Sequence, residues 1–345
     1  MSRKISIQIL ADQLGLSKYA VSRALSGKPG VSAATRQRVI DLARTLGYQN
    51  SSVQDVSVHK SEPSSSYILI CISQIHADNP SYWQRVLNGL LQSCGKLGLQ
   101  YIIVSPEIGT QPASISPQKA IAPHIDWSRC AGIVMIGTFP HPLVQLISRT
   151  ECPYVLVDHV DPLVSCDKVN NDNIEAGLKI TRHLLAQKCK NIVFLNDEVW
   201  SSSFADRLTG AKLAVDSLGD PKTKLTEWKI PYGGTGWEQS VFERLTGFKD
   251  EDKPDAWIGA NDDIAICWMR KLQAEGFPVP DRFRVAGIDN VETSALISPK
   301  LTTVNLCKEE LGQRALETLL RRIERPGAPV ETIHLSTNLI PRSST

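Results

Sequence analysis

The sequence lacks long apolar runs, a secretory signal and a strong bias toward one charge, and each absence narrows its class. No apolar run in its 345 residues approaches the roughly 18 residues of a membrane-spanning helix, which excludes an integral membrane protein. The first residues are polar and basic, without the apolar segment of a secretory signal, so we expect a cytoplasmic protein. Charged residues make up 21% and hydrophobic residues 42% of the chain, which excludes wholesale disorder and allows compact cores.

Motifs of enzymes, metal sites and disulfide frameworks are also missing. The eight cysteines are scattered without a C-x-x-C pair, which predicts reduced thiols. No G-x-S-x-G, Walker A, H-E-x-x-H or strand-following G-x-G-x-x-G motif occurs. Asp158, His159, Asp161 and Cys166 have an irregular spacing that favours a solvated loop after a strand over a set of metal ligands. We therefore predict no catalytic residue, no metal site and no cofactor.

What the sequence does have is an uneven distribution of charge. The formal net charge of the whole chain is only +2, but residues 1–50 contain eight Lys and Arg residues against two Asp. This leaves +6 on that segment and −4 on the remainder. A small basic region on a mildly acidic body is typical of a nucleic-acid-binding domain joined to a second functional unit. A basic tail without a partner is the other interpretation, and the local pattern of the segment must decide between them.

Residues 1–48 have the pattern of three short helices, each preceded by a serine that is a good N-cap. Gly15 supplies the turn between the first two helices, Ala11 permits their close approach, and Val21 fills the angle between them. This spacing predicts a helix-turn-helix, whose second helix lies in the major groove of DNA. A three-helix module without a DNA role is the alternative, and the basic charge disfavours it.

Exposed residues of the predicted second helix and of the helix N-termini are candidate DNA contacts. Arg and Lys donate to guanine O6 and N7 in the major groove, and Tyr contacts an adjacent base edge or a thymine methyl group. The predicted base contacts are Lys18, Tyr19 and Arg23. Hydroxyl and backbone N–H groups near helix N-termini suit phosphates, a role that is compatible with simple capping. The predicted phosphate contacts are Ser6, Ser17, Ser22, Ser32 and Thr35.

The same segment resembles the DNA-binding head of the lactose/galactose-repressor (LacI/GalR) family. The matching stretches are SKYAVSRALS at 17–26, KPGVS at 28–32, TR at 35–36 and LGY at 46–48. The resemblance implies that Lys18 and Tyr19 discriminate between operators and that Arg23 contacts a base. Ala20 stands where the family usually has Thr.

Residues 49–66 form a Ser-rich linker that departs from this family. The family usually has Pro-Asn followed by a short helix whose leucine enters the minor groove, and here Asn50, Ser51 and Ser57 occupy those positions. Helix propensity across the segment is low, and Asp55 would face phosphates. We therefore predict a degenerate hinge that forms a weak helix or none.

Residues 67–345 alternate short apolar runs with helical patterns, which predicts parallel sheets with helices on both faces. Roughly 280 residues of this kind suggest two lobes. The predicted strands are 68–73, 101–104, 133–136, 154–157, 192–195, 256–258 and 284–288. The resemblance extends through this body and implies a bilobed, periplasmic-binding-protein-like fold with two Rossmann-like subdomains for effector binding and dimerisation. The expected first lobe is about 67–168 and 305–330, and the expected second lobe is about 169–304 and 331–345.

Polar residues follow the predicted strands, at the edge where open α/β sheets bind ligands, although loops after strands are polar in any case. Hydroxyl, amide and carboxylate groups at that edge suit a polyol or another polar small molecule. Resemblance in stretches such as 79–83, 203–210 and 287–290 favours a ligand site there. Tyr232 or Trp237 would stack on an apolar sugar face. The predicted effector-binding residues are Ser81, Tyr82, Thr138, Arg207, Tyr232, Asn261 and Asp289.

Two residues of this set have specific expected roles. The planar guanidinium of Arg207 would hold vicinal hydroxyls or a carboxylate, and Asp289 would accept from a pair of hydroxyls. Asp262 is interpreted instead as a first-turn residue of a helix that Asn261 caps, where the helix dipole favours negative charge.

These observations predict a sequence-specific DNA-binding transcription regulator, most simply a repressor, and not an enzyme. A small polar effector, a sugar or sugar derivative, would change operator affinity by shifting the relative orientation of the lobes. One helix-turn-helix contacts too little DNA for high specificity, so we expect a homodimer on a pseudo-palindromic operator. The alternatives are a regulator that uses a nucleobase corepressor and a sugar-binding protein with a non-functional head.

Overall fold

The computed structural model describes most of the chain, namely residues 7–25, 31–32, 35–39, 42, 66–73, 81–106, 116–199, 201–218 and 220–345. The chain divides into two compact units, residues 1–63 and 64–345. Ser6 and residues 49–65 of the predicted linker lie outside the described residues, so the phosphate contact at Ser6 and the degenerate hinge stay predictions.

The first unit contains the predicted helix-turn-helix. Its helices α1 (Ile7–Leu14) and α2 (Lys18–Leu25) are joined by a turn at Gly15, whose φ of 65° is the left-handed conformation that glycine adopts without strain. Val21 is fully buried, and Ala11 of α1 belongs to the same small core. The glycine and the two apolar residues therefore have the roles that their spacing predicts.

Serine side chains cap the N-termini of the second and third helical segments of this unit. Ser17 Oγ accepts a hydrogen bond from Ala20 N at 3.1 Å, and Ser32 Oγ accepts one from Thr35 N at 3.1 Å. Residues 35–39 are helical. Both predicted N-caps are thus confirmed, because each hydroxyl satisfies a backbone N–H that has no partner within its helix.

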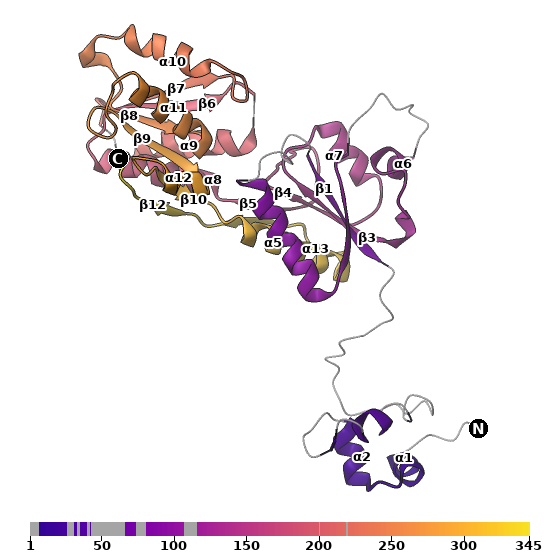
Figure 1. Ribbon diagram of the computed structural model, residues 1–345. Coiled ribbons are helices and arrows are strands. Elements are labelled where there is room, and N and C mark those ends of the chain that lie inside the picture. The colour runs from indigo at the N-terminus through magenta and orange to yellow at the C-terminus, as the bar shows by residue number, and fades with distance from the viewer. Residues whose placement is uncertain are drawn as a thin grey trace. The chain divides into compact units, whose positions relative to one another are not determined.

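The second unit contains two six-stranded sheets, one in each lobe (Figure 1). The first sheet is parallel throughout, with the order β11-β5-β4-β3-β1-β2. Its strands are β1 (Tyr67–Ile72), β2 (Gln100–Val104), β3 (Cys130–Ile136), β4 (Tyr154–Val157), β5 (Asp167–Asn171) and β11 (Thr332–Leu335). Its helices are α5 (Trp83–Leu97), α6 (Pro117–Ile121), α7 (His141–Ser148) and α13 (Glu309–Glu324).

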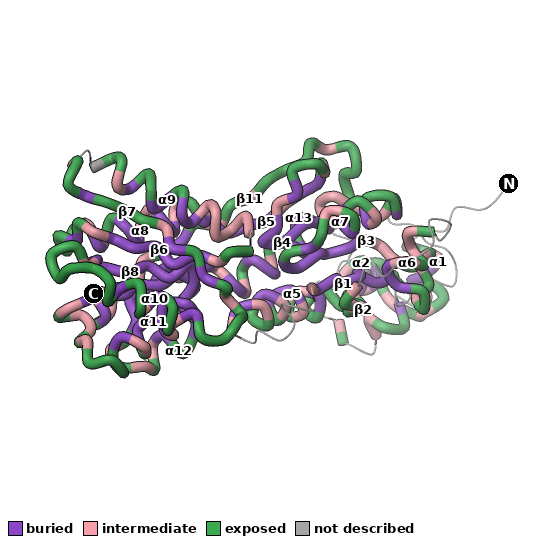
Figure 2. The backbone as a smooth tube through the Cα atoms, turned by 90° about the horizontal axis from the view of Figure 1, so that it is seen from above, coloured by how far each residue is buried: buried purple, intermediate pink, exposed green. Residues whose placement is uncertain are grey.

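Successive side chains of β1 enter two different cores, because a strand alternates its side chains between the faces of the sheet. Ile68 and Ile70 pack in the core that α5 and α13 cover, whereas Leu69 and Cys71 pack in the core that α6 and α7 cover. Figure 2 shows the result, with buried strands inside and exposed helical surfaces outside. The apolar runs of the sequence are therefore strands buried on both faces.

The second lobe repeats this architecture with one reversed edge strand. Its order is β12-β10-β9-β8-β6-β7, and β12 pairs antiparallel with β10. Its strands are β6 (Asn191–Asp197), β7 (Lys224–Ile230), β8 (Ala256–Gly259), β9 (Arg284–Asp289), β10 (Thr302–Asn305) and β12 (Asn338–Ile340). Its helices are α8 (Asn173–Ala186), α9 (Ser202–Leu218), α10 (Trp237–Thr246), α11 (Asp262–Ala274) and α12 (Glu292–Leu296), and single 3-10 turns lie at Trp127–Arg129 and Asp250–Asp252. Each predicted strand coincides with one of the observed strands, and the predicted fold class is confirmed.

The chain passes between the lobes three times, after β5, after β10 and after β11. The first passage lies near Asp172 and the third near Ser336, a few residues beyond the predicted lobe boundaries, because β5 and β11 both belong to the first sheet. The sequences DKVNN of β5 and TIHL of β11 have too few apolar residues to be recognised as strands. They are strands because β5 pairs with β4 and β11 pairs with β5.

Two glycines bring α8 and α9 into backbone contact. A Cβ on Gly177 would lie 1.8 Å from Arg207 O, and one on Gly210 would lie 1.9 Å from Ile174 O, so no larger residue fits at either position. This close approach sets Arg207 of α9 against the first turn of α8, where Asn173 lies.

Candidate functional site

Arg207 forms the centre of a buried polar group in the second lobe. Its side chain is only 3% exposed. Nε donates to Asn173 Oδ1 at 2.9 Å, Nη1 donates to Ala260 O at 2.6 Å, and Nη2 lies 3.0 Å from Asp289 Oδ1. The guanidinium is thus held in one orientation by α8, by the end of β8 and by the end of β9.

Asp289, the last residue of β9, is buried and conformationally strained. Its φ is 126° and that of Asn290 is 53°, both in the region that residues with a side chain rarely adopt. Burial raises the pKa of Asp289 to about 6, although the charges of Arg207 and Lys308 oppose the rise. Lys308 Nζ also donates to the backbone oxygen of Asp289, which holds this strand end in place.

Asn261 and Tyr232 form a second part of the group beside Arg207. Asn261 caps α11 through a hydrogen bond from Ile264 N to its Oδ1 at 2.9 Å, as predicted. Its Nδ2 donates to Tyr232 OH at 3.1 Å, and Tyr232 OH donates to Asp263 Oδ2 at 3.2 Å. Burial is the main reason that the pKa of the Tyr232 phenol is raised, so the hydroxyl stays a neutral donor.

Tyr82 and Asp158 form the corresponding part of the first lobe. Tyr82 OH donates to Asp158 Oδ2 at 2.9 Å and accepts from Asn171 Nδ2 at 3.1 Å. Burial raises the pKa of Tyr82 well above its ordinary value, and it also raises the pKa of Asp158. The charge of Asp289 in the second lobe adds to the rise of the Tyr82 pKa, and the charge of Arg207 opposes it.

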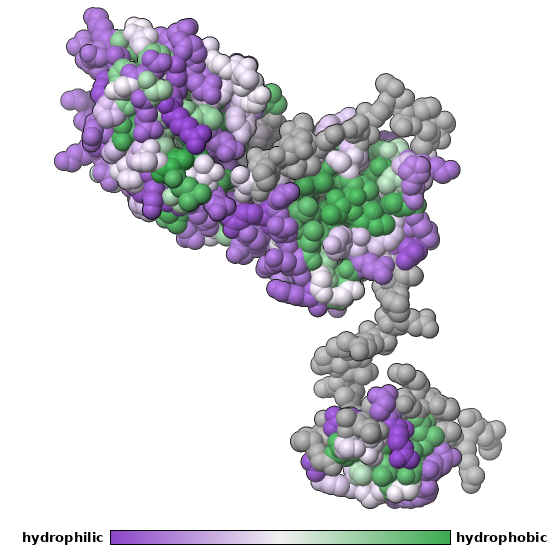
Figure 3. Space-filling model, viewed as in Figure 1, coloured by the Kyte–Doolittle hydropathy of each residue, from purple (hydrophilic) through white to green (hydrophobic). Residues whose placement is uncertain are grey.

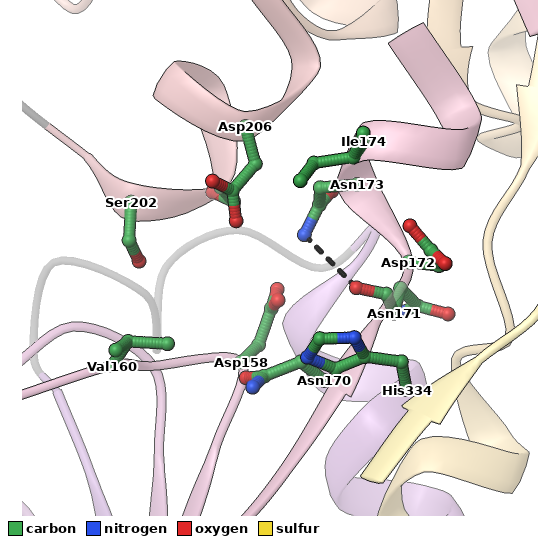
Figure 4. A pocket seen from close by; sticks show the side chains of 11 residues that line it. Asp158, Val160, Asn170, Asn171, Asp172, Asn173, Ile174, Ser202, Asp206 and His334 are labelled. Atoms are coloured by element: carbon green, nitrogen blue, oxygen red, sulfur yellow. Dashed lines mark hydrogen bonds between the residues drawn. The ribbon is translucent and has the colours of Figure 1, made fainter. Parts of the chain in front are cut away.

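A small polar cavity of about 40 Å³ adjoins Asp158 (Figure 4). Asp158 reaches it from the loop after β4, and Ser202 and Asp206 reach it from α9. Asn173 Nδ2 donates to Asn171 O at 3.3 Å beside it. The lining residues are Asp158, Val160, Asn170, Asn171, Asp172, Asn173, Ile174, Ser202, Ser203, Asp206 and His334. Residues from both lobes thus enclose a space for one or two water-sized groups.

Most of the predicted effector residues meet in this group, which contains Tyr82, Arg207, Tyr232, Asn261 and Asp289. Ser81 lies in the turn that precedes α5, next to Tyr82, and is partly exposed. Thr138 follows β3 and is exposed, and no hydrogen bond joins its side chain to the described members of the group. Trp237, the alternative stacking residue, is buried in the core of the second lobe.

The loop after β4 differs from its prediction. Asp158, His159 and Asp161 are all buried, where the sequence predicts a solvated loop. Asp161 Oδ2 lies 2.7 Å from His141 Nδ1, a hydrogen-bond partner twenty residues away in the chain. Asp158, a member of the polar group, directly follows an apolar strand. It is buried because residues distant in the chain, such as Tyr82, pack over it, and the local sequence does not indicate this.

Asp262 and Lys308 are two further ionisable side chains that are buried, and the sequence predicts the burial of neither. Asp262 lies in the first turn of α11 as predicted, but it is enclosed: its Oδ1 accepts from Thr303 Oγ1 at 2.5 Å and its Oδ2 accepts from Val291 N at 2.9 Å. Burial raises the pKa of Asp262 to about 7. Lys308 is 1% exposed and lies where the chain returns from β10 to α13.

Within the described segments, no group of three or more His, Cys, Asp and Glu side chains is arranged to hold a metal ion. None of the helices in the described part of the chain is both long and apolar enough to cross a membrane.

The predicted base contacts lie together on α2. Lys18 is exposed, and Tyr19 is 68% exposed. A large aromatic ring is usually at least half-buried, so its exposure here is notable. Arg23 Nη1 donates to Tyr19 OH, and its guanidinium lies 5.2 Å from the centre of the Tyr19 ring. Ser22 is exposed on the same helix. The arrangement offers two cationic side chains and one aromatic side chain on one short surface.

Both units match families of known proteins. Residues 6–51 match the family "Bacterial regulatory proteins, lacI family", and residues 181–345 match the family "Periplasmic binding protein-like domain". The HTH-type transcriptional repressor PurR of Mannheimia succiniciproducens is 25% identical over 344 residues, which are 98% of each chain. The chain thus joins the DNA-binding domain of the lacI family to a periplasmic-binding-protein-like domain, which is the organisation of LacI/GalR-family regulators. It is accordingly a DNA-binding transcription regulator with an effector-binding body.

Solved structures of LacI/GalR-family proteins share the fold over nearly the whole chain. The complex of the transcriptional regulator CelR with cellobiose has a TM-score of 0.67 at 21% identity, covering 99% of this chain and 100% of that one. The lac repressor dimer bound to operator and the anti-inducer ONPF has a TM-score of 0.67 at 19% identity, covering 99% of each chain.

Proposed function

We propose that this LacI/GalR-family regulator is a cytoplasmic repressor whose affinity for a pseudo-palindromic operator depends on a small polar effector, a sugar or sugar derivative. The observation that carries the proposal is the buried polar group to which Arg207 and Asp289 of one lobe and Tyr82 and Asp158 of the other contribute. A relative that matches 98% of the chain is named a transcriptional repressor, which supports the direction of regulation.

In the proposed DNA complex, α2 enters the major groove. Lys18, Tyr19 and Arg23 contact base edges, and the exposure of Lys18 and Tyr19 supports this role. The proposed phosphate contacts are Ser6, Ser17, Ser22, Ser32 and Thr35. Because phosphate contacts release counterions, binding should weaken steeply as the salt concentration rises.

The chemistry of the polar group supports a polyhydroxylated effector. A sugar hydroxyl both donates and accepts, so it can pair with the carboxylates of Asp158 and Asp289 and with the guanidinium of Arg207. The ring of Tyr232 offers an apolar face next to these groups. An effector that contacts both lobes binds one relative orientation of the lobes better than others, and this differential affinity shifts the population of the DNA-binding state.

We propose a homodimer with a contribution from the edge strand β2 of the first lobe. Tyr101 and Ile103 of this strand and Leu97 of α5 are large apolar side chains that are exposed. Figure 3 shows hydrophobic side chains gathered on the first lobe. Exposed apolar surface along an unpaired strand edge is typical of a surface that another chain covers.

The first test is footprinting of the full-length protein on fragments of its source genome at two salt concentrations. A protected pseudo-palindrome whose affinity falls steeply with salt is the expected result. Binding without sequence preference, or no binding, would overturn the proposed repressor and favour a solute-binding protein with a non-functional head.

The effector is tested by thermal-shift screening of the same protein with sugars, sugar phosphates and nucleobases. A saturating ligand at about 100 times its Kd stabilises the folded protein by about 2.7 kcal/mol, which raises the unfolding temperature measurably. A shift with a sugar that also changes operator affinity is expected. A shift with a nucleobase instead would replace the sugar in the proposal and leave the DNA-binding role intact.

A further inference from the structure

Cys130 and Cys152 form a thiol pair in the first lobe, away from the polar group at Arg207. Cys130 is the first residue of β3 and is aligned with Tyr67, the first residue of β1. Cys152 lies two residues before β4. Both therefore lie at the edge of the sheet where the strands begin, whereas Asp158 and the other effector candidates follow the strand ends. Both thiols are partly exposed.

The two side chains are neighbours in the structure. Cys152 Sγ lies 4.0 Å from Cys130 O, and Cys130 Sγ lies 3.6 Å from Gly132 O. β3 and β4 are parallel neighbours with Ile133 aligned to Tyr154, so Cys130 and Cys152 precede the paired stretch on adjacent strands. Both side chains pack against the same core, the one that α6 and α7 cover, so they lie on the same face of the sheet.

The two neighbouring thiols differ in acidity. The Cys130 side chain is the main cause that lowers the pKa of Cys152 to about 7, whereas the Cys152 side chain and burial raise the pKa of Cys130. The thiolate is the form of cysteine that attacks oxidants, so Cys152 is the nucleophile and Cys130 is a protonated partner beside it.

The other six cysteines lack this arrangement. All lie within the described residues, and burial raises the pKa of each of them. They are Cys71, Cys94, Cys166, Cys189, Cys267 and Cys307. The nucleophilic thiol and its partner are therefore confined to one place in the chain.

We propose that Cys130 and Cys152 are a redox-active dithiol that hydroperoxides oxidise to an intramolecular disulfide. In the first step the Cys152 thiolate attacks one peroxide oxygen, the O–O bond breaks, and a sulfenic acid forms with release of water or an alcohol. In the second step the Cys130 sulfur attacks the sulfenic sulfur, its proton passes to the departing hydroxide, and water leaves as the S–S bond forms. Two thiols lose two electrons and two protons in total, and the peroxide gains them.

The test uses the full-length protein, reduced and then exposed to hydrogen peroxide, followed by alkylation and mass spectrometry. We expect the mass before alkylation to fall by two hydrogen atoms, and two cysteines to escape alkylation. Tryptic cleavage after Arg149 and Lys168 leaves Cys152 and Cys166 on one peptide, so fragmentation between them must place the cross-link. Cys166→Ser is the matched control, and it should keep the cross-link.

Two variants separate the roles of the sulfurs. Cys152→Ser should abolish the rapid reaction with peroxide, and Cys130→Ser should stop it at a sulfenic acid that dimedone traps. In the unaltered protein, Cys152 should react with iodoacetamide at pH 7 about 5- to 10-fold faster than an ordinary thiol, with a midpoint near pH 7. Complete alkylation after peroxide, a cross-link to another cysteine or an unchanged rate in Cys152→Ser would each overturn the proposal.

Discussion

Arg207 Nη2 lies 3.0 Å from Asp289 Oδ1, but no described residue donates a hydrogen bond to that oxygen. The two charges are close enough to attract each other. The N–H groups of Arg207 do not point at Oδ1 well enough for a hydrogen bond, so its lone pairs stay available. A buried acceptor without a donor is unfavourable unless a ligand supplies one. The pair therefore combines a fixed cation with an acceptor oxygen that a ligand hydroxyl can use.

Replacing Asp289 by Asn tests this use of the oxygen. Asp289→Asn keeps the shape of the side chain but removes the charge that strengthens a hydrogen bond to the ligand. We expect affinity for the effector found by screening to fall about 10- to 100-fold. Titration calorimetry measures the affinity, and footprinting without effector should show operator binding unchanged. Asp281→Asn, at an exposed position, is the control and should bind the effector normally. Equal affinity in the two variants would remove Asp289 from the site.

Tyr82→Phe tests the hydrogen bonds of the first lobe. The change removes the hydroxyl that donates to Asp158 and accepts from Asn171, and it leaves a buried carboxylate with one donor fewer. We expect the free energy of unfolding to fall by about 1–3 kcal/mol in urea denaturation. A loss of no more than about 0.5 kcal/mol at Tyr82, as for a surface substitution, would mean that its hydroxyl is not engaged in solution.

The buried carboxyl of Asp262 predicts a pH dependence of stability. Folding raises its pKa to about 7, so between about pH 4 and pH 7 the folded state holds a proton that the unfolded state has released. Stability from this group is therefore lost as the pH rises through that interval. In Asp262→Asn this loss disappears, so from pH 5 to pH 8 the variant should gain about 2–3 kcal/mol relative to the unaltered protein.

Urea denaturation at the two pH values measures the difference. Asp216→Asn, on the exposed side of α9, is the matched control and should follow the unaltered protein at both. If Asp262→Asn also followed it, the carboxyl would be ionised throughout and a different group would dominate the pH dependence.

Arg23→Ala tests the DNA-binding surface of α2. Loss of one bidentate contact to a base should weaken specific binding by about 1–3 kcal/mol, and circular dichroism should show the helices intact. Arg38→Ala, an exposed basic residue of the third helical segment, is the control: it should weaken specific and non-specific binding equally. An equal effect of the two changes on specific binding would remove Arg23 from the base contacts.

The parts of the site that the sequence predicts are those with a local signal. Gly15 and Val21 follow the helix-turn-helix spacing, Asn261 precedes an amphipathic helix, and Arg207 and Asp289 match a family pattern. Tyr82 and Asp158 are 76 positions apart, and nothing near Asp158 in the chain indicates that a hydroxyl will cover it.

The strands β5 and β11 and the cation Lys308 escaped prediction for the same reason. Neither strand has an apolar run, and each is held by neighbours from distant parts of the chain. Lys308 can be buried because the carbonyl oxygens of Asp289 and Leu306 accept its hydrogen bonds. These two acceptors come together only when the second lobe has folded.

The three passages of the chain between the lobes have a consequence for synthesis. Neither lobe is one continuous stretch, and the strand that completes the first sheet, β11, is encoded after nearly the whole of the second lobe. During synthesis on the ribosome, the sheet of the first lobe therefore stays incomplete until the second lobe has been made. A premature stop codon at Glu331 would strip β11 and β12 together, and both lobes would lose an edge strand in a single event.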